Sequence, residues 1–273
     1  MVGAALSVQF GAALATTAFD VAGPLGFVWL RVGLAALLLV ALNARALRSV
    51  EAPRLRWILA AGAAVAFMNA CFYQAIDRIP LGLATTVEFL GPLAVAVLGS
   101  RRAVDFLWIA LAGAGVALLG SPGVELDAVG LAFAFGAAAG WAAYIVLAKR
   151  MLEDWSVGTG LSLTLLVAAI LLAPFGLAAG GSALLDPEVL ALGLAVAVLG
   201  SVLPFSLELA ALRQLSAATF GILLSLEPAV AAFAGAVALG QVPTALEALA
   251  IVLVMAASAG ASLGARRVVP PEV

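Results

Sequence analysis

The stretch AIDRIPLGLATTVEFLGP, residues 75–92, aligns without a gap against ALRQLSAATFGILLSLEP, residues 211–228, and this pairing decides the predicted architecture. The offset between the two segments is 136 residues, half of the 273-residue chain. Few positions are identical, Pro92 and Pro228 among them, but the lengths of the apolar runs and the positions of the loops agree at the same offset. The pattern predicts an internal duplication, with one repeat in each half.

The composition places both repeats in a membrane. Hydrophobic residues make up 65% of the chain and charged residues 10%, with a mean hydropathy of +1.22, whereas soluble domains carry about 25% charged residues. Because a spanning helix needs about 20 mostly apolar residues, we expect an all-α polytopic membrane protein with ten transmembrane helices and the lipid bilayer as its first partner. The predicted spans are 1–19, 24–42, 57–77, 80–100, 106–121, 129–148, 157–178, 189–212, 216–239 and 244–264.

The repeats are predicted at residues 1–122 and 123–267, followed by a cytoplasmic tail at 268–273. Five spans per repeat is an odd number, so the second repeat enters the membrane inverted relative to the first. Inverted repeats are an architecture of secondary transporters, with the substrate site near the bilayer midplane.

Basic residues predict the orientation, because Lys and Arg near span ends stay on the cytoplasmic side. With the N-terminus inside, Arg78 alone falls in an external connection, and Arg31 lies within a span. Both termini are therefore expected in the cytoplasm. The other eleven of the thirteen basic residues fall in cytoplasmic connections: Arg45, Arg48, Arg54, Arg56, Arg101, Arg102, Lys149, Arg150, Arg213, Arg266 and Arg267.

Other classes of function find little support. The net charge is −2, there is no His, and Cys71 is the single cysteine, which weighs against nucleic-acid binding, a His-based metal site and an internal disulfide. No phosphate loop, metal-spaced cluster or activated nucleophile is present. We expect no catalytic residue, no metal and no cofactor.

Four charged residues lie inside predicted spans and away from the span ends: Arg31, Glu88, Glu208 and Glu227. A charge at the bilayer centre is costly, so such residues are functional candidates. The alternative is that they pair with one another and lock helices together. One guanidinium cannot satisfy three carboxylates, so at least one acid must carry a proton, face a watery cavity or await a cationic partner.

Proline and other polar positions extend the candidate site. Pro92, Pro204 and Pro228 are predicted helix breaks, where freed carbonyls line a binding cavity or where proline serves packing alone. Further substrate-binding candidates are Asn69, Tyr73, Thr85, Trp141 and Tyr144. For the aromatic residues, core packing or an interfacial belt is the alternative.

A small-residue motif at Gly136 and Gly140 favours a packing role. Small residues four apart on a membrane helix usually allow close contact with a neighbouring helix. We therefore expect this face of the predicted span 129–148 to pack tightly.

Longer motifs suggest a family. The segment DRIPLGLATTVEFLGPLAVA at 77–96, followed by SRRAVDF at 100–106, closely resembles the drug/metabolite transporter superfamily of EamA type, and within it the threonine/homoserine exporters. LPFSLE at 203–208 and SLEPA at 225–229 resemble the matching segments of the second half. The resemblance implies a bacterial inner-membrane protein with ten helices in two inverted repeats. It also implies efflux of small neutral amino acids, with protons as the coupling ion. Against this family the first helix looks several residues short, so the start is expected to be truncated or misassigned.

Two rival functions stay open. One is export of another small metabolite or drug in the same superfamily, and the other is a membrane assembly partner without transport activity. Polar residues around a central cavity would favour transport, and a dry packed interior would favour the assembly partner. The oligomeric state is not predicted.

Overall fold

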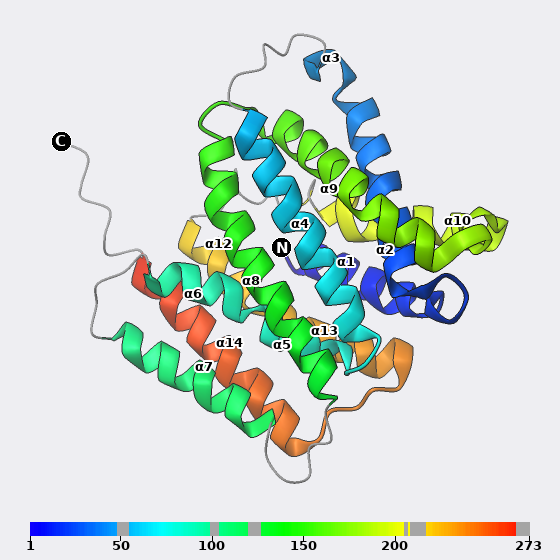
Figure 1. Ribbon diagram of the computed structural model, residues 1–273. Coiled ribbons are helices and arrows are strands. Elements are labelled where there is room, and N and C mark those ends of the chain that lie inside the picture. The colour runs from blue at the N-terminus through cyan, green and yellow to red at the C-terminus, as the bar shows by residue number, and fades with distance from the viewer. Residues whose placement is uncertain (48–54, 99–103, 120–126, 205–206, 208–216, 266–273) are drawn as a thin grey trace.

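The computed structural model describes residues 1–47, 55–98, 104–119, 127–204, 207 and 217–265, and every regular element within these ranges is a helix. The elements, shown in Figure 1, are α1 (Val2–Thr16), α2 (Phe19–Leu42), α3 (Ala44–Leu47), α4 (Leu55–Ile76), α5 (Leu81–Glu88), α6 (Leu90–Leu98), α7 (Asp105–Leu119), α8 (Ala128–Met151), α9 (Val157–Gly180), η1 (Gly181–Leu185), α10 (Pro187–Ala197), the π-helical turn η2 (Val198–Val202), α12 (Ala217–Leu224), α13 (Glu227–Leu239) and α14 (Ala245–Ala265).

Most of these helices are apolar and many are long. Among the described residues, seven helical stretches are long and apolar enough to cross a bilayer: Phe19–Leu42, Leu55–Ile76, Leu81–Leu98, Ala128–Met151, Val157–Leu185, Thr219–Leu239 and Ala245–Leu263. Three shorter apolar stretches are Val2–Thr16, Asp105–Leu119 and Pro187–Val202. The predicted all-helical, multi-pass membrane fold is confirmed.

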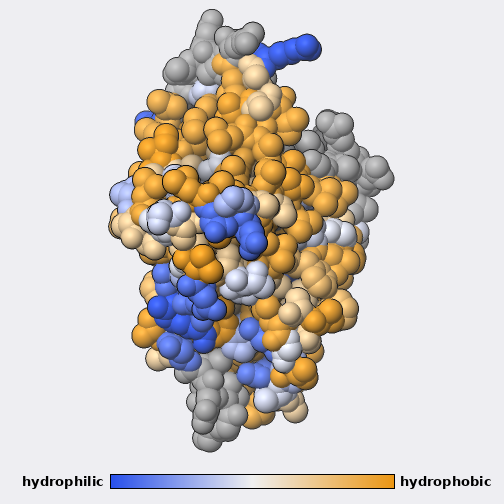
Figure 2. Space-filling model, turned by 90° about the vertical axis from the view of Figure 1, so that its right-hand side faces the viewer, coloured by the Kyte–Doolittle hydropathy of each residue, from blue (hydrophilic) through white to orange (hydrophobic). Residues whose placement is uncertain are grey.

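The surface suits a lipid environment. Leu98 is 85% exposed and Phe106 75% exposed, and Figure 2 shows apolar residues over much of the face that it presents, with hydrophilic residues gathered in separate patches. Soluble monomers rarely expose apolar area on this scale. Bilayer lipids would cover it.

Two predicted spans are each broken in the middle, between α5 and α6 and between α12 and α13. The breaks lie beside two of the predicted helix breaks, Pro92 and Pro228, and each segment as a whole is still long and apolar enough to cross a bilayer. Pro92 and Pro228, just after the breaks, have no N–H to bond the carbonyl four residues earlier, which weakens the helix at those points. Glu88 is the last residue of α5 and Glu227 the first of α13.

α1 is followed by a helix, α2, that is kinked near its start. α1 ends at Thr16, three residues before the predicted end of the first span, and α2 contains non-helical backbone at Gly23, with φ +66°. Glycine tolerates a positive φ that other residues adopt with strain. Pro24 then begins the straight part of α2, where the second span is predicted to start.

Glycines let pairs of helices approach closely. A Cβ on Gly26 of α2 would lie 2.9 Å from the Cα of Gly180 in α9, and one on Gly140 of α8 would lie 2.9 Å from the Cα of Met68 in α4. The tight packing predicted for the motif at Gly136 and Gly140 is confirmed.

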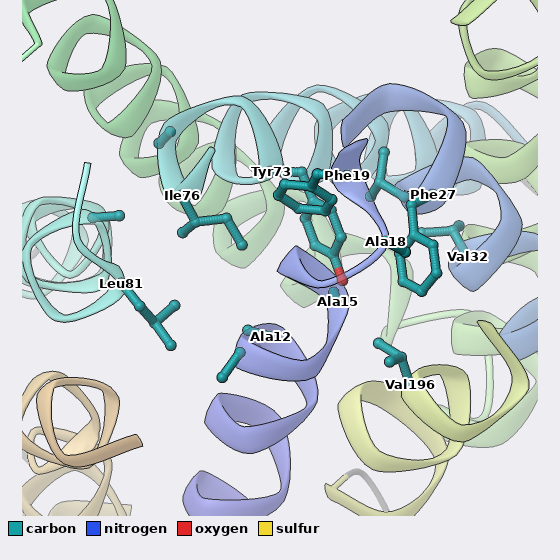
Figure 3. Close-up of a cluster of buried hydrophobic side chains, with 14 of the residues drawn as sticks. Ala12, Ala15, Ala18, Phe19, Phe27, Val32, Tyr73, Ile76, Leu81 and Val196 are labelled. Carbon is teal, nitrogen blue, oxygen red and sulfur yellow. The ribbon is translucent and has the colours of Figure 1, made fainter. Parts of the chain in front are cut away.

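An apolar cluster packs where α1 turns into α2. The ring centroid of Phe19 lies 5.7 Å from that of Tyr73 and 6.5 Å from that of Phe27. Figure 3 shows these rings beside Ala15 and Ala18 of the turn. All five side chains are buried, so the cluster joins α1, α2 and α4 into one wall.

Candidate functional site

A cavity of about 280 Å³ lies among α1, α2, α4, α5, α8, α9, α10, η2 and α13. This volume is close to the lower end of the range for small-molecule sites, about 300–1,000 Å³, so it suits one small ligand. The polar and aromatic members of its wall are Gln9, Arg31, Asn69, Phe72, Tyr73, Glu88, Trp141, Tyr144, Ser201 and Glu227.

Three predicted intramembrane charges meet at this cavity. Arg31 comes from the middle of α2, Glu88 from the end of α5 and Glu227 from the start of α13, and each is at most 9% exposed. Glu88 lies close enough to Glu227 and to Arg31 to interact electrostatically with both. The helix break after Glu88 and the one before Glu227 deliver both carboxyl groups to the same wall.

Arg31 is held by groups from several helices. Its Nη2 donates to the Oδ1 of Asn69 on α4, and its Nη1 lies 3.4 Å from both the carbonyl oxygen of Gly200 and the Oγ of Ser201. The guanidinium carbon also lies 5.2 Å from the centre of the Tyr73 ring, within the range of a cation–π contact. The positive end of Arg31 therefore has a fixed place in the wall.

The predicted aromatic residues also reach the cavity. Trp141 and Tyr144, one turn apart on α8, both line it. Trp141 packs edge-to-face on Phe89 with 5.0 Å between ring centroids. Tyr73 combines a place in the apolar cluster with a place in the wall, so these rings offer both packing and a surface for a ligand.

Other predicted residues lie elsewhere. Thr85 is buried behind the wall, with its Oγ1 3.5 Å from the Oε1 of Gln9. Pro92 and Pro228 lie in the first turns of α6 and α13 and do not line the cavity, whereas Pro204 does. Glu208 lies outside the described residues.

The wall also includes residues that sequence reasoning did not select. Ser201 and Gly200 come from the π-helical turn η2, and Gln9 from α1. A Gly-Ser pair just before Pro204 in an apolar run was the available signal, since such pairs mark irregular helix turns. Among the described residues, no group of three His, Cys, Asp or Glu side chains gathers as metal ligands.

Comparison with known proteins gives consistent relatives. The family model of the EamA-like transporter family matches residues 128–263. The chain is 42% identical over 265 residues to the threonine/homoserine exporter RhtA of Salmonella typhimurium (strain SL1344), and 41% identical to that of Escherichia coli (strain K12). Each alignment covers 96% of this chain and 89% of the relative.

A solved crystal structure shares the fold. It superimposes with a TM-score of 0.61 at 21% sequence identity, covering 97% of this chain and 99% of its own. At that identity the likeness concerns the fold alone. The sequence relatives carry the assignment, and on their evidence the chain belongs to the EamA-like transporter family.

Proposed function

We propose that this protein exports small neutral amino acids of the threonine and homoserine kind by alternating access. One observation carries the proposal: a single small cavity joins a buried guanidinium, Arg31, to two buried carboxyl groups, Glu88 and Glu227. The names of the relatives, threonine/homoserine exporters, supply the substrate class.

The wall matches the chemistry of a zwitterion. The ammonium group of an amino acid needs a carboxylate, and its carboxylate needs a guanidinium or another donor of positive character. Glu88 or Glu227 would bind the first and Arg31 the second. The amide of Asn69 and the rings of Tyr73, Trp141 and Tyr144 would bound the rest of the molecule, together with apolar wall residues.

Proton antiport follows from the same pair of acids. Two carboxyl groups in one buried wall repel each other when both are ionised, so the pair is easier to accommodate when one of them is protonated. An arriving substrate ammonium would favour the doubly ionised pair and release the proton. Glu88 and Glu227 would thus exchange a proton for a substrate molecule.

The proposed architecture has ten spans in two inverted repeats, at 1–122 and 123–267, with a tail at 268–273. Support comes from the seven long and three short apolar helical stretches of the described chain, and from the family match at 128–263, which lies inside the second repeat. A short helix spans a locally thinned or protein-lined region more readily than a full bilayer.

The proposed location is the inner membrane of a bacterium, with both termini in the cytoplasm. The asymmetry of basic residues supports it. A hydrogen bond of 2.9 Å from the Leu81 N–H to the Oε1 of Gln241 joins the α4–α5 and α13–α14 connections, and the proposed topology assigns both of them to one side of the membrane.

Counterflow in proteoliposomes tests the function. Vesicles loaded with unlabelled threonine should transiently accumulate labelled threonine and labelled homoserine, and less of acidic or large aromatic amino acids. Accumulation of none of the amino acids in the panel would contradict the proposal. In that case either a different metabolite or a role without transport would have to replace it.

A further inference from the structure

The π-helical turn η2 packs against α1 and α2 in the wall of the cavity, and its backbone bonding is irregular. The N–H of Leu203 bonds the carbonyl of Val198, five residues earlier, as in a π-helix. Pro204 comes next and has no N–H. A donor at position 204 would bond the carbonyl of Leu199 in a π-helix and that of Gly200 in an α-helix, so neither carbonyl receives a hydrogen bond from this position.

Side chains of other helices bond these two carbonyls. The Oγ of Ser7 on α1 donates to the carbonyl of Leu199 at 2.6 Å, and the Nη1 of Arg31 on α2 lies 3.4 Å from that of Gly200. Leu199 and Gly200 are half-buried, and carbonyls away from water are costly without a donor, so this pairing stabilises the turn. Glycine at position 200 permits the approach, because a Cβ there would lie 3.1 Å from Nη1.

The oxygens that accept from the two Nη atoms of Arg31 are neutral: an amide oxygen of Asn69, a backbone carbonyl and the hydroxyl of Ser201. Asn69 presents its oxygen because its Nδ2 donates to the carbonyl of Val65 at 2.9 Å. Neutral acceptors orient a guanidinium without neutralising its charge, which in this wall also interacts electrostatically with Glu88. The Nε of Arg31 is buried and has no hydrogen-bond partner among the described residues.

We propose that the turn η2, through Gly200 and Ser201, positions Arg31 to receive the carboxylate of the transported amino acid. The inference rests on the proposed function and assigns positioning roles to residues that do not themselves bind the charge. Irregular π turns retained in helices frequently mark functional sites. Here the turn supplies acceptors that a regular helix would keep in its own hydrogen bonds.

Recognition of the carboxylate should therefore depend on Ser201. Ser201→Ala removes one acceptor, and the loosened guanidinium should bind threonine less tightly. Threonine amide, which has no carboxylate, should be affected less. We expect the KM for threonine counterflow to rise roughly three- to tenfold with a nearly unchanged maximal rate. The ratio by which threonine outcompetes threonine amide should fall by a similar factor.

Two further variants separate positioning from packing. Ser201→Thr keeps the hydroxyl, so its KM for threonine and its preference for threonine over threonine amide should match those of the unaltered protein. Ser162→Ala is the matched control, because Ser162 is fully buried and bonds the Leu39 carbonyl of α2 away from the cavity; it should leave the threonine-to-amide ratio unchanged.

The outcomes distinguish the two levels of proposal. If the unaltered protein transports threonine and prefers it to the amide, but Ser201→Ala keeps both the KM and the ratio, the positioning role is overturned and the transport function stands. If Ser201→Ala fails to insert into the membrane, Gly200→Ala takes its place as the test, because its Cβ would crowd the Nη1 of Arg31. An unchanged preference of Gly200→Ala for threonine over threonine amide would then overturn the positioning role. If the unaltered protein transports no amino acid, both proposals fail.

Discussion

At the scale of single residues, the cost of charge in a bilayer organises the site. A carboxylate at the centre of a membrane costs at least about 2.5–3.5 kcal/mol on insertion scales. Glu88 is nevertheless buried, in the same wall as Glu227 and Arg31. An ion pair that only held the helices together would need one carboxyl group beside Arg31. The wall contains two, and the proposed transport function gives the second one a role.

Glu88→Gln keeps the size of the side chain and removes its charge. Because a hydrogen bond to a charged partner is worth about 1.5–3 kcal/mol, we expect threonine counterflow to fall roughly tenfold or more while the protein still inserts. The measurement is counterflow normalised to purified protein. Glu188→Gln, at an exposed position on α10, is the control and should transport normally. Wild-type rates for Glu88→Gln would return Glu88 to a packing role.

Sequence reasoning identified the residues whose presence in a membrane is expensive. Arg31, Glu88 and Glu227 stood out in apolar runs, and the structure brings them to one cavity. Ser201 did not stand out, because a hydroxyl is inexpensive in a membrane helix and can bond its own backbone. Its place beside Arg31 depends on how α10 packs on α2, which no local pattern specifies.

At the scale of helices, small residues set the distances. α2 and α9 touch backbone to backbone near Gly26 and Gly180. Without a hydrophobic driving force between helices in lipid, such close packing supplies much of the association free energy.

Gly26→Ala should therefore separate α2 from α9. Its Cβ would lie 2.9 Å from the Gly180 backbone, so we expect a loss of about 1–3 kcal/mol of stability, as in other overpacked sites. Gly33→Ala on the same helix is the matched control, since nothing lies within 4 Å of its Cβ position. Melting curves in detergent should show a lower midpoint for Gly26→Ala only. Equal midpoints for both variants would show that the contact is not tight.

Helix interruptions were only partly predictable. Proline flagged the positions of the breaks that precede α6 and α13, because a missing N–H is a local property. The hydropathy of the same segments still indicated single spans. Gly200, Ser201 and Pro204 mark an irregular turn in the sequence, but the π spacing at Val198–Val202 could not be predicted, since donors from α1 and α2, far away in sequence, satisfy its carbonyls.

At the scale of the whole molecule, the membrane limits the possible folds. Backbone groups in lipid must bond within the protein, so an apolar chain of this composition forms helices. Hydropathy alone therefore predicted the fold class. It could not predict that α1, α4, α8 and α13 would share one cavity, because the order of helices around a bundle depends on packing between distant segments.

The proposed topology gives a separate prediction. A reporter enzyme active only outside the cytoplasm, fused after Arg267, should be inactive, and the same reporter inserted after Asp186 should be active, because the proposed topology places eleven of the thirteen basic residues on the cytoplasmic side. If both reporters were active, the C-terminus would lie outside and the number of spans would be odd. Two inverted repeats of five spans each would then be ruled out.

The most direct test of the central claim, that Arg31 and Glu227 bind one substrate in one cavity, is protection of a cysteine in the wall. Leu161 of α9 lines the cavity, and Cys71 is first replaced by Ser. Threonine should slow the labelling of Leu161→Cys by a thiol reagent, and leave that of Asp127→Cys, an exposed control, unchanged. Adding Arg31→Gln or Glu227→Gln should abolish the protection. Two results would contradict a shared site. One is that threonine still protects Leu161→Cys after each of the two changes, and the other is that it gives no protection in a Leu161→Cys protein that still transports threonine.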